Sequence, residues 1–345
     1  MADAQWSEIR EKVAAGERLS AADGVFLYRP DVDLHDVGGL ADQVRQRKNG
    51  NRVFYNRNAH LNPTNICVYE CDLCAYNRKP GEPDAYVMTP DEVLQAGQEA
   101  IDAGCTELHI VSGIHPDKAF EWYLDVVRSL HAVFPRLHLK AFTAVEIAWF
   151  AQSTKRNNRM TLEDLIRVGV GSLPGGGAEI FAPEIRAQIC PRKPDARTWL
   201  GVHRIAHQLG LRTNATMLFG HVEQAEHRID HLMELRRQQD ASGGFQTFVP
   251  LVFHPQNTKL AHIEPASTDL ILRTVAISRL MLDNFDHIKA SWGSLGVDLA
   301  QAALACGADD LDGAVRQEKP GRAAGIRAAA VLTDLEIRRR ILEAG

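Results

Sequence analysis

Residues 89–113, "TPDEVLQAGQEAIDAGCTELHIVSG", predict one amphipathic helix followed by one short buried strand. Thr89 is a favourable N-cap residue, Pro90 suits the first helical position, and Glu92 lies where it completes a capping box. Apolar residues then recur at helical spacing until Gly104, which is a typical helix stop. The apolar run "LHIVSG" comes directly afterwards, so this stretch indicates a repeating helix–strand architecture.

The same alternation continues along the chain, which contains about seven short apolar runs separated by helices. A second capping box, from Thr161 to Asp164, is expected to start one of these helices, and "LDGAV" (311–315) is a weak candidate for an eighth strand. Strands that alternate with helices predict crossover connections and a parallel sheet. We therefore expect an α/β fold, a TIM-type (β/α) barrel that is complete or nearly complete. Residues 1–50 are predicted to be an N-terminal helical extension, and residues 51–345 a single barrel domain.

Composition limits the classes of function. The chain has 345 residues, 45% of them hydrophobic, and a formal net charge of −5 without a strongly basic block, so nothing favours nucleic-acid binding. The N-terminal residues lack the apolar core of a signal peptide, and no apolar run approaches the roughly 20 residues that span a bilayer. Six cysteines, three of them clustered, suit a reducing compartment. We expect a cytoplasmic protein with no membrane partner.

The stretch "NICVYECDLCAYNRKP" (65–80) places three cysteines, Cys67, Cys71 and Cys74, in a C-x-x-x-C-x-x-C pattern. Three thiols are too few for a closed tetrahedral zinc site, and an odd number cannot pair off as disulfides. A [4Fe–4S] cluster normally takes thiolates, and three of them leave one iron open to another ligand. We therefore predict that these cysteines are metal ligands and hold a [4Fe–4S] cluster.

Other unusual residues each follow an expected strand: "SGIHP" (112–116), Glu146 in "FTAVE", "PGGGAE" (174–179), "GHVE" (220–223) and "FHP" (253–255). The loops after the strands of a parallel barrel build its active site. The cysteines follow the first strand, so we expect all these residues to lie on one rim.

The cysteine spacing resembles that of the radical S-adenosylmethionine superfamily, although Leu73 stands where that family usually has an aromatic residue. The resemblance implies that the open iron binds S-adenosylmethionine and that one electron cleaves it to a 5′-deoxyadenosyl radical. Arg186 or Lys193 is a candidate for the methionine carboxylate, and Glu146 for a ribose hydroxyl, with helix capping as its alternative role. The residues expected to bind the cofactor are Leu73, Tyr76, Gly113, Glu146, Gly175, Gly176, Arg186 and Met217.

Longer phrases, among them "HLNPTNIC", "LKAFTAVEI", "SLPGGGAEIF" and "TNATMLFGHVE", resemble the aminofutalosine synthases of menaquinone biosynthesis. That resemblance implies that the radical adds to the enol ether of 3-[(1-carboxyvinyl)oxy]benzoate, and that 6-amino-6-deoxyfutalosine forms with loss of a carboxyl group. It also implies an electron donor such as flavodoxin or ferredoxin. The substrate is an aromatic dicarboxylate, and the residues expected to bind it are Asn62, His115, Lys193, His221 and His254.

Two alternatives remain open. The sibling cyclase, cyclic dehypoxanthine futalosine synthase, shares the cysteines and the glycine loop, but its pattern favours "HSFSP" where this chain has "KAFTA". A metal-dependent barrel hydrolase could use His115, His221, Glu223 and His254, but it would leave the three cysteines without a role. The deazaflavin precursor synthases are more distant relatives of the same type.

Overall fold

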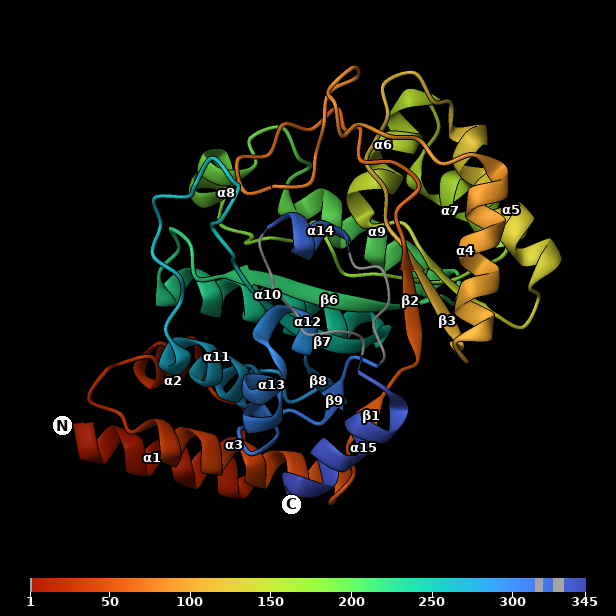
Figure 1. Ribbon diagram of the computed structural model, residues 1–345. Coiled ribbons are helices and arrows are strands. Elements are labelled where there is room, and N and C mark those ends of the chain that lie inside the picture. Colours follow the sequence, from red (N-terminus) through yellow and green to blue (C-terminus); the bar gives the residue numbers. More distant parts are fainter. Residues whose placement is uncertain (1, 314–318, 325–331) are drawn as a thin grey trace.

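In the computed structural model, which describes residues 2–313, 319–324 and 332–345, one curled sheet of parallel strands is surrounded by helices (Figure 1). The strands are β1 (Phe54–Tyr55), β2 (Asn58–Leu61), β3 (Glu107–Ile110), β4 (His138–Ala141), β5 (Val170–Leu173), β6 (Arg212–Phe219), β7 (Phe245–Val252), β8 (His287–Ala290) and β9 (Asp310–Leu311). The helices before β3 are α1 (Ala2–Ala15), α2 (Ala21–Leu27), α3 (Leu34–Asn49) and α4 (Pro90–Asp102). Those between β3 and β7 are α5 (Phe120–Val133), α6 (Ala144–Ser153), α7 (Asn158–Val168), α8 (Pro183–Ile189), α9 (Ala196–Gln208) and α10 (Ala225–Ser242). The later helices are α11 (Thr268–Met281), α12 (Trp292–Leu295), α13 (Val297–Leu304), α14 (Lys319–Ala323) and α15 (Asp334–Glu343).

The sheet closes on itself through a divided first strand. Its order is β1-β9-β8-β7-β6-β5-β4-β3-β2, so the two end strands, β1 and β2, follow each other in the chain with only residues 56 and 57 between them. β1 pairs with β9, whereas β2 pairs with β3. The predicted TIM-type barrel is therefore confirmed, and β9 takes the place of the uncertain eighth strand. Residues 314 and 315 of that predicted run lie outside the described residues.

Helix α4 confirms the local signals that predicted it. Thr89 caps the helix and forms the expected capping box with Glu92, and Gly104 adopts a φ of 74° just after the helix. The second predicted capping box is wrong, because α7 begins at Asn158 and its N-cap is Asn157. Thr161 instead lies inside the helix, where its hydroxyl donates to the carbonyl of Asn157.

Several strands alternate polar and apolar residues, which is unusual for parallel strands covered by helices. In β3, Leu108 and Ile110 belong to the apolar core, whereas Glu107 and His109 occupy the alternate positions. The sequences "HLKA" in β4 and "HIKA" in β8 repeat this alternation. Because successive side chains of a strand point to opposite faces, the apolar set packs under the surrounding helices and the polar set faces the barrel interior.

The N-terminal helices lie on one side of the barrel, at the bottom of Figure 1, and the predicted helical extension is confirmed. Helix α3 packs against α11. The buried Arg273 of α11 donates to the carbonyls of Leu27 and Val32, which ties the extension to the barrel. The proposed division at residue 50 stays a prediction.

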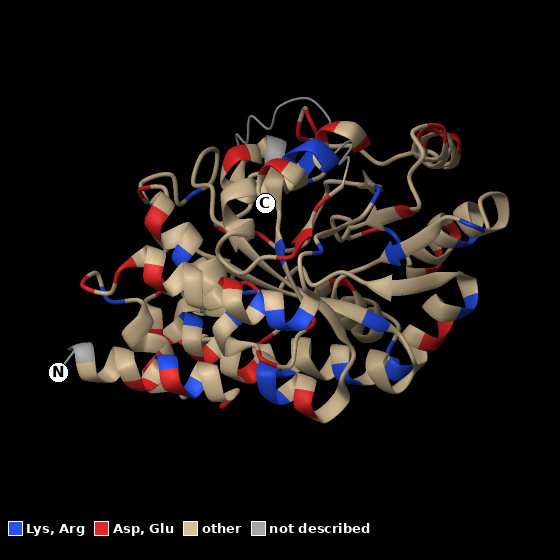
Figure 2. Ribbon diagram, turned by 90° about the horizontal axis from the view of Figure 1, so that it is seen from below, with Lys and Arg blue, Asp and Glu red and all other residues tan. Residues whose placement is uncertain are grey.

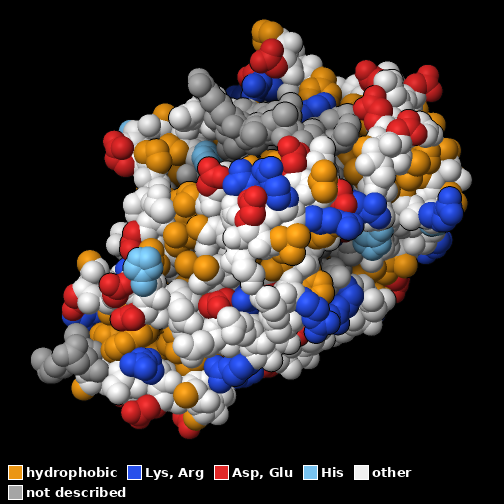
Figure 3. All heavy atoms as spheres, turned by 60° about the horizontal axis from the view of Figure 1, so that its bottom comes forward, with side chains coloured by type: hydrophobic (Ala, Val, Ile, Leu, Met, Phe, Trp, Pro, Cys, Tyr) orange, Lys and Arg blue, Asp and Glu red, His pale blue; other side chains and the backbone are white. Residues whose placement is uncertain are grey.

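The outer surface carries mixed charges. Acidic and basic residues are interspersed along the helices in Figure 2, and the face in Figure 3 shows several small groups of both signs. Within the described part of the chain, no helix has the combination of length and apolarity required to cross a membrane.

Candidate active site

The residues singled out in the sequence gather at the carboxyl ends of the strands. The cysteine loop follows β2, Ser112 and Gly113 follow β3, and the loop of Thr143 follows β4. The three-glycine loop follows β5, and the segments beginning at Gly220 and Phe253 follow β6 and β7. The expected common rim is therefore present, at the end of the barrel where parallel barrels carry their active sites.

The cysteine loop is held in place mainly by backbone contacts. The N–H of Cys67 donates to the carbonyl of Arg78, and the N–H of Cys74 donates to the carbonyl of Cys71 in a tight turn. The N–H of Asp72 donates to the carbonyl of Ile189, at the end of α8. These bonds fix the backbone that presents the three thiols without engaging their sulfur atoms.

The thiols of the loop are close enough to influence one another. Cys71 is buried, and Cys67 and Cys74 are half-buried. Burial raises the pKa of Cys71 to about 12 and also raises the pKa of Cys67, while the charge of Cys74 acts on both in the same direction. The ammonium group of Lys193 opposes these shifts. These shifts oppose formation of the thiolates, so iron binding would have to drive their deprotonation, as a metal does for the thiols that coordinate it.

The donor set fits an iron–sulfur cluster better than a single metal ion. Among the described residues, no group of three or more His, Cys, Asp or Glu side chains is arranged to hold one ion. Three thiols on one loop are the donors that an iron–sulfur cluster normally takes. The same observation gives no support to the hydrolase alternative, whose four side chains do not come together as metal ligands.

Gly113 is required by packing against this loop. A Cβ atom at Gly113 would lie 2.3 Å from the carbonyl oxygen of Ile66, the residue directly before Cys67. In the three-glycine loop, a Cβ at Gly175 would lie 2.8 Å from the backbone of Ala215. At Gly176 it would meet only the Thr143 side chain, at 3.1 Å. Of these three glycines, Gly176 therefore has the most open surroundings.

Glu146 connects two rim segments. Its carboxylate accepts from the N–H of Ser112 at 2.8 Å and from the N–H of Thr143 at 2.7 Å, and it completes the capping box at the start of α6. Burial raises its pKa to about 7, although these hydrogen bonds act in the opposite direction. The capping role considered for Glu146 is thus present, while contact with a ribose stays a prediction.

The two candidate cations differ in their surroundings. Arg186 is buried and donates to the carbonyls of Ala178, Ile180 and Pro194, so it braces the loops on both sides of α8. Lys193 forms an ion pair with Glu179, and the nearby carboxylate and thiols raise its pKa well above the ordinary value. The structure therefore brings Lys193, rather than Arg186, to the cysteine loop.

The three candidate histidines each make local hydrogen bonds. The ring of His115 accepts from the N–H of Asp117 at 3.0 Å. His221 accepts from the N–H of Val222 at Nδ1, so its Nε2 donates to the carbonyl of Leu218 at 3.1 Å. His254 contacts the carbonyl of Ser294 at 2.9 Å. Each ring helps to fix a rim loop, and substrate contact by any of them stays a prediction.

The remaining predicted residues lie around the barrel mouth or in its wall. The amide of Asn62 donates to the carbonyl of Val111 at 3.0 Å, and the Tyr86 hydroxyl bridges Tyr76 and the carbonyl of Asn62. Met217 is fully buried, and Leu73 is partly buried against the apolar core.

Sequence reasoning missed two features of this region. The Oγ atom of Ser112 and the Oδ1 atom of Asn62 are both buried without a partner, which makes Ser112 an additional candidate for ligand contact. A cavity of about 510 Å³ also lies outside the rim, between α6, α7 and the loop before α9, and Tyr69 and Lys193 connect it to the cysteine loop. The available signal for Ser112 was its place directly before Gly113, whereas no sequence motif indicated the cavity.

Comparisons with known proteins agree with this geometry. The model of the Radical SAM superfamily matches residues 61–235, and the model of the CofH/MqnC C-terminal region matches residues 242–345. Aminodeoxyfutalosine synthase from Streptomyces coelicolor is 44% identical, over 90% of this chain and 83% of the relative. The Thermus thermophilus protein of the same name is 43% identical, over 98% of this chain and 91% of the relative.

A differently named relative is 5-amino-6-(D-ribitylamino)uracil–L-tyrosine 4-hydroxyphenyl transferase from Methanoculleus marisnigri, which is 38% identical over 98% of this chain and 94% of its own length. Among solved structures, the FeFe-hydrogenase maturase HydG from Carboxydothermus hydrogenoformans has a TM-score of 0.77 at 19% identity, covering 99% of this chain and 78% of its own. Methylornithine synthase (PylB) has a TM-score of 0.74, also at 19% identity, covering 97% and 96%. At these identities the two structures support the fold alone.

Proposed function

Since this chain belongs to the radical SAM superfamily, whose members use a [4Fe–4S] cluster and S-adenosylmethionine, we propose that it is an aminofutalosine synthase. The observation that carries the proposal is the similarity to two aminodeoxyfutalosine synthases, which extends over most of the chain at higher identity than the similarity to the 4-hydroxyphenyl transferases. The proposed substrate is 3-[(1-carboxyvinyl)oxy]benzoate, and the proposed product is 6-amino-6-deoxyfutalosine.

In this proposal Cys67, Cys71 and Cys74 would hold the cluster. When bound, the cluster would supply the electron for reductive cleavage of S-adenosylmethionine, and the residues described below would hold and orient the reactants. Lys193 is paired with Glu179 beside the cysteine loop, and we assign it the stabilisation of negative charge there. Gly176, with its open surroundings, leaves room for the cofactor.

The other contributions of the chain are positioning and the exclusion of water. The hydrogen bonds of Glu146 join the β3 rim to α6, and those of Arg186 join the loops around α8, so both residues hold the walls of the site in one arrangement. A rigid wall matters because holding two reactants in near-attack geometry supplies a large part of the rate acceleration. We further propose that flavodoxin or ferredoxin delivers the electron in the cytoplasm.

The test is turnover by anaerobically reconstituted protein. Reduced enzyme with S-adenosylmethionine should convert the enol ether to aminofutalosine, detected by mass spectrometry. Parallel reactions would offer dehypoxanthine futalosine, and tyrosine with 5-amino-6-(D-ribitylamino)uracil. Free 5′-deoxyadenosine with a cyclised product from dehypoxanthine futalosine, or a 4-hydroxyphenyl adduct, in the absence of product from the enol ether, would contradict the proposal.

A further inference from the structure

Buried polar atoms without partners are concentrated on two neighbouring strands of the barrel. Among the described residues, ten buried side-chain N and O atoms have no hydrogen-bond partner, and four of them belong to β2, β3 and the residues that follow these strands. The four atoms are Asn58 Oδ1, Asn62 Oδ1, His109 Nε2 and Ser112 Oγ. An unpaired buried polar group costs about 1–3 kcal/mol, so such a concentration indicates a missing partner.

Two of these atoms lie deep in the barrel rather than at its rim. His109 occupies the third position of β3 and is the register partner of His60 on β2. The two imidazole rings are tilted against each other, with their centroids 4.6 Å apart. Asn58, which is only 2% exposed, lies on the same face of β2, and its amide is 3.4 Å from Nε2 of His60. Asn58 and the two imidazoles therefore line one wall of the barrel interior.

Two lysines lie near His109. Burial lowers the pKa of the His109 imidazole most, and the charges of Lys140, its register partner on β4, and of Lys289 act in the same direction. The imidazole is therefore neutral and keeps one N–H donor. The neighbouring His60 is neutral as well, because burial lowers its pKa to about 4. An anion that accepts from the His109 donor would also lie near the two ammonium groups.

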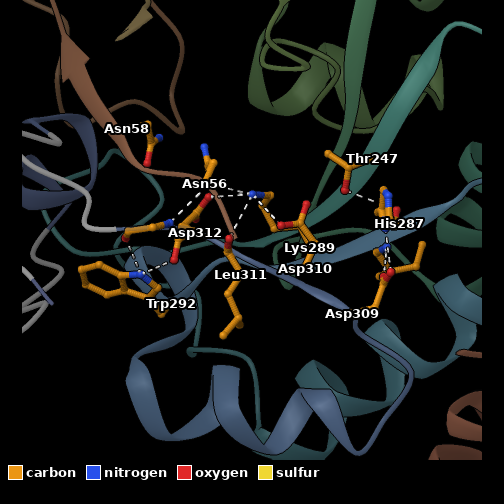
Figure 4. Close-up of polar contacts among 12 residues, drawn as sticks. Asn56, Asn58, Thr247, His287, Lys289, Trp292, Asp309, Asp310, Leu311 and Asp312 are labelled. Carbon is orange, nitrogen blue, oxygen red and sulfur yellow. Dashed lines mark hydrogen bonds and ion pairs between the residues drawn. The ribbon is translucent and has the colours of Figure 1, made fainter. Parts of the chain in front are cut away.

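The ammonium groups of the two lysines are themselves paired with carboxylates. Lys140 pairs with Glu107 at 2.8 Å, two residues before His109 in β3. Figure 4 shows Lys289 within a network in which it contacts Asn56, Leu311 and Asp310. This polar network forms the floor of the barrel. The carboxylates paired with the lysines offset part of their positive field.

We propose that His109 forms an anion subsite inside the barrel that binds the ring carboxylate of the aromatic substrate. The assignment rests on the proposed function, in which the enol-ether end must lie at the rim beside the adenosyl carbon. The ring carboxylate is then the group that points inward. His109 and Ser112 are three residues apart along an extended segment, which corresponds to a depth of roughly 10 Å. An aromatic ring is shorter than this depth.

The variant His109→Phe tests the subsite, because it removes the N–H donor and keeps an aromatic ring against His60. Two substrates should be compared: the dicarboxylate enol ether, and 2-phenoxyacrylate, which lacks the ring carboxylate. The wild-type enzyme should prefer the dicarboxylate in kcat/KM, and the variant should reduce this preference roughly 10- to 100-fold, as expected for loss of a hydrogen bond to a charged group.

His203→Phe is the matched control. His203 is also buried with an unpartnered Nε2 atom, but it lies on α9 outside the barrel, with its ring centroid 3.9 Å from that of Trp199. This variant carries a similar packing change and should keep the wild-type preference. A preference that survives in His109→Phe, or that falls equally in both variants, would overturn the subsite and leave the unpartnered atoms to bound water.

Equilibrium binding separates failure of the subsite from failure of the proposed function. Reconstituted protein should bind 3-hydroxybenzoate more tightly than phenol, and His109→Phe should abolish that difference. If the wild-type enzyme makes no aminofutalosine but retains His109-dependent benzoate binding, the proposed function fails and the anion subsite stands. If aminofutalosine forms while benzoate and phenol bind alike, the subsite fails and the function stands.

Discussion

Replacement of Gly113 by alanine should damage the cluster site through packing alone. The new Cβ atom would lie 2.3 Å from the carbonyl oxygen of Ile66 and 2.9 Å from its carbonyl carbon, and both belong to backbone that cannot rotate away. An ordinary contact needs roughly 1 Å more, so either the end of β3 or the residue preceding Cys67 must move. Overpacking of this kind typically costs about 1–3 kcal/mol.

This displacement would move Cys67, the first cysteine of the loop. The N–H of Gly113 donates to the carbonyl of Thr64, and the N–H of Val68 donates to the carbonyl of Ile114, so the cysteine loop is bonded to this segment on both sides of the clash. We therefore expect Gly113→Ala to reconstitute with less iron per chain and to lower the thermal unfolding midpoint by a few degrees.

Iron content, iron–sulfur absorbance and thermal unfolding would be measured on the same preparations. Gly201→Ala provides the matched control, because a Cβ atom at Gly201 on α9 would meet nothing within 4 Å. Alanine is favoured over glycine inside a helix, by about 1 kcal/mol, so this variant should be neutral or slightly stabilised. Wild-type iron content and an unchanged midpoint in Gly113→Ala would refute the reasoning.

Three further outcomes follow from individual contacts. Cys71→Ala should lose the cluster absorbance and the cleavage of S-adenosylmethionine, whereas Cys306→Ala, remote in sequence from the loop, should keep both; a fully active Cys71→Ala protein would contradict the cluster assignment. Burial lowers the pKa of His231 to about 3, so between this value and its ordinary pKa of about 6.5 the unfolded chain binds a proton that the folded chain does not. The free energy of unfolding should therefore decrease as the pH is lowered through this window, by up to about 1.4 kcal/mol per pH unit, and urea unfolding of His231→Gln should show a smaller decrease. Arg279→Met should lower the free energy of unfolding by about 3–5 kcal/mol, because it leaves the buried carboxylate of Asp309 without its main partner; a change below about 1 kcal/mol in denaturant titration would contradict this.

The fold could be predicted because its signals are local. The start of α4 depends on Thr89 and Glu92, which are three residues apart, and alternation of helices with short strands limits the topology to very few arrangements. Thr161 shows where local signals fail. Both Asn157 and Thr161 can cap a helix, and the sequence does not show that Asn157 starts the helix one turn earlier. The divided first strand was also missed, because it is defined by pairing with β9, more than 250 residues away.

The positions of the rim residues could be predicted, but their contacts could not. Arg186 was a reasonable candidate for a carboxylate because it is a cation in a rim loop, yet its donors are used by three backbone carbonyls. That outcome depends on how the chain folds around α8, which no spacing in the sequence encodes. His109 was missed for the opposite reason, because it lies in "LHIVSG", a run that was interpreted only as an apolar strand.

Hydrogen bonds divide the polar residues of this barrel into two groups with different tasks. Glu146, Arg186 and His221 make several contacts to nearby loops and backbone, so changing them should mainly disturb the shape of the rim. Asn58 and His109 retain buried atoms without partners, and a bound ligand that paired with them would remove that cost. Chemical type alone does not separate the groups, since each contains a histidine. The two groups differ in whether the folded chain already uses their hydrogen-bond donors and acceptors. Because the unused atoms of Asn58 and His109 lie in the interior of the barrel, we expect substrate contacts there.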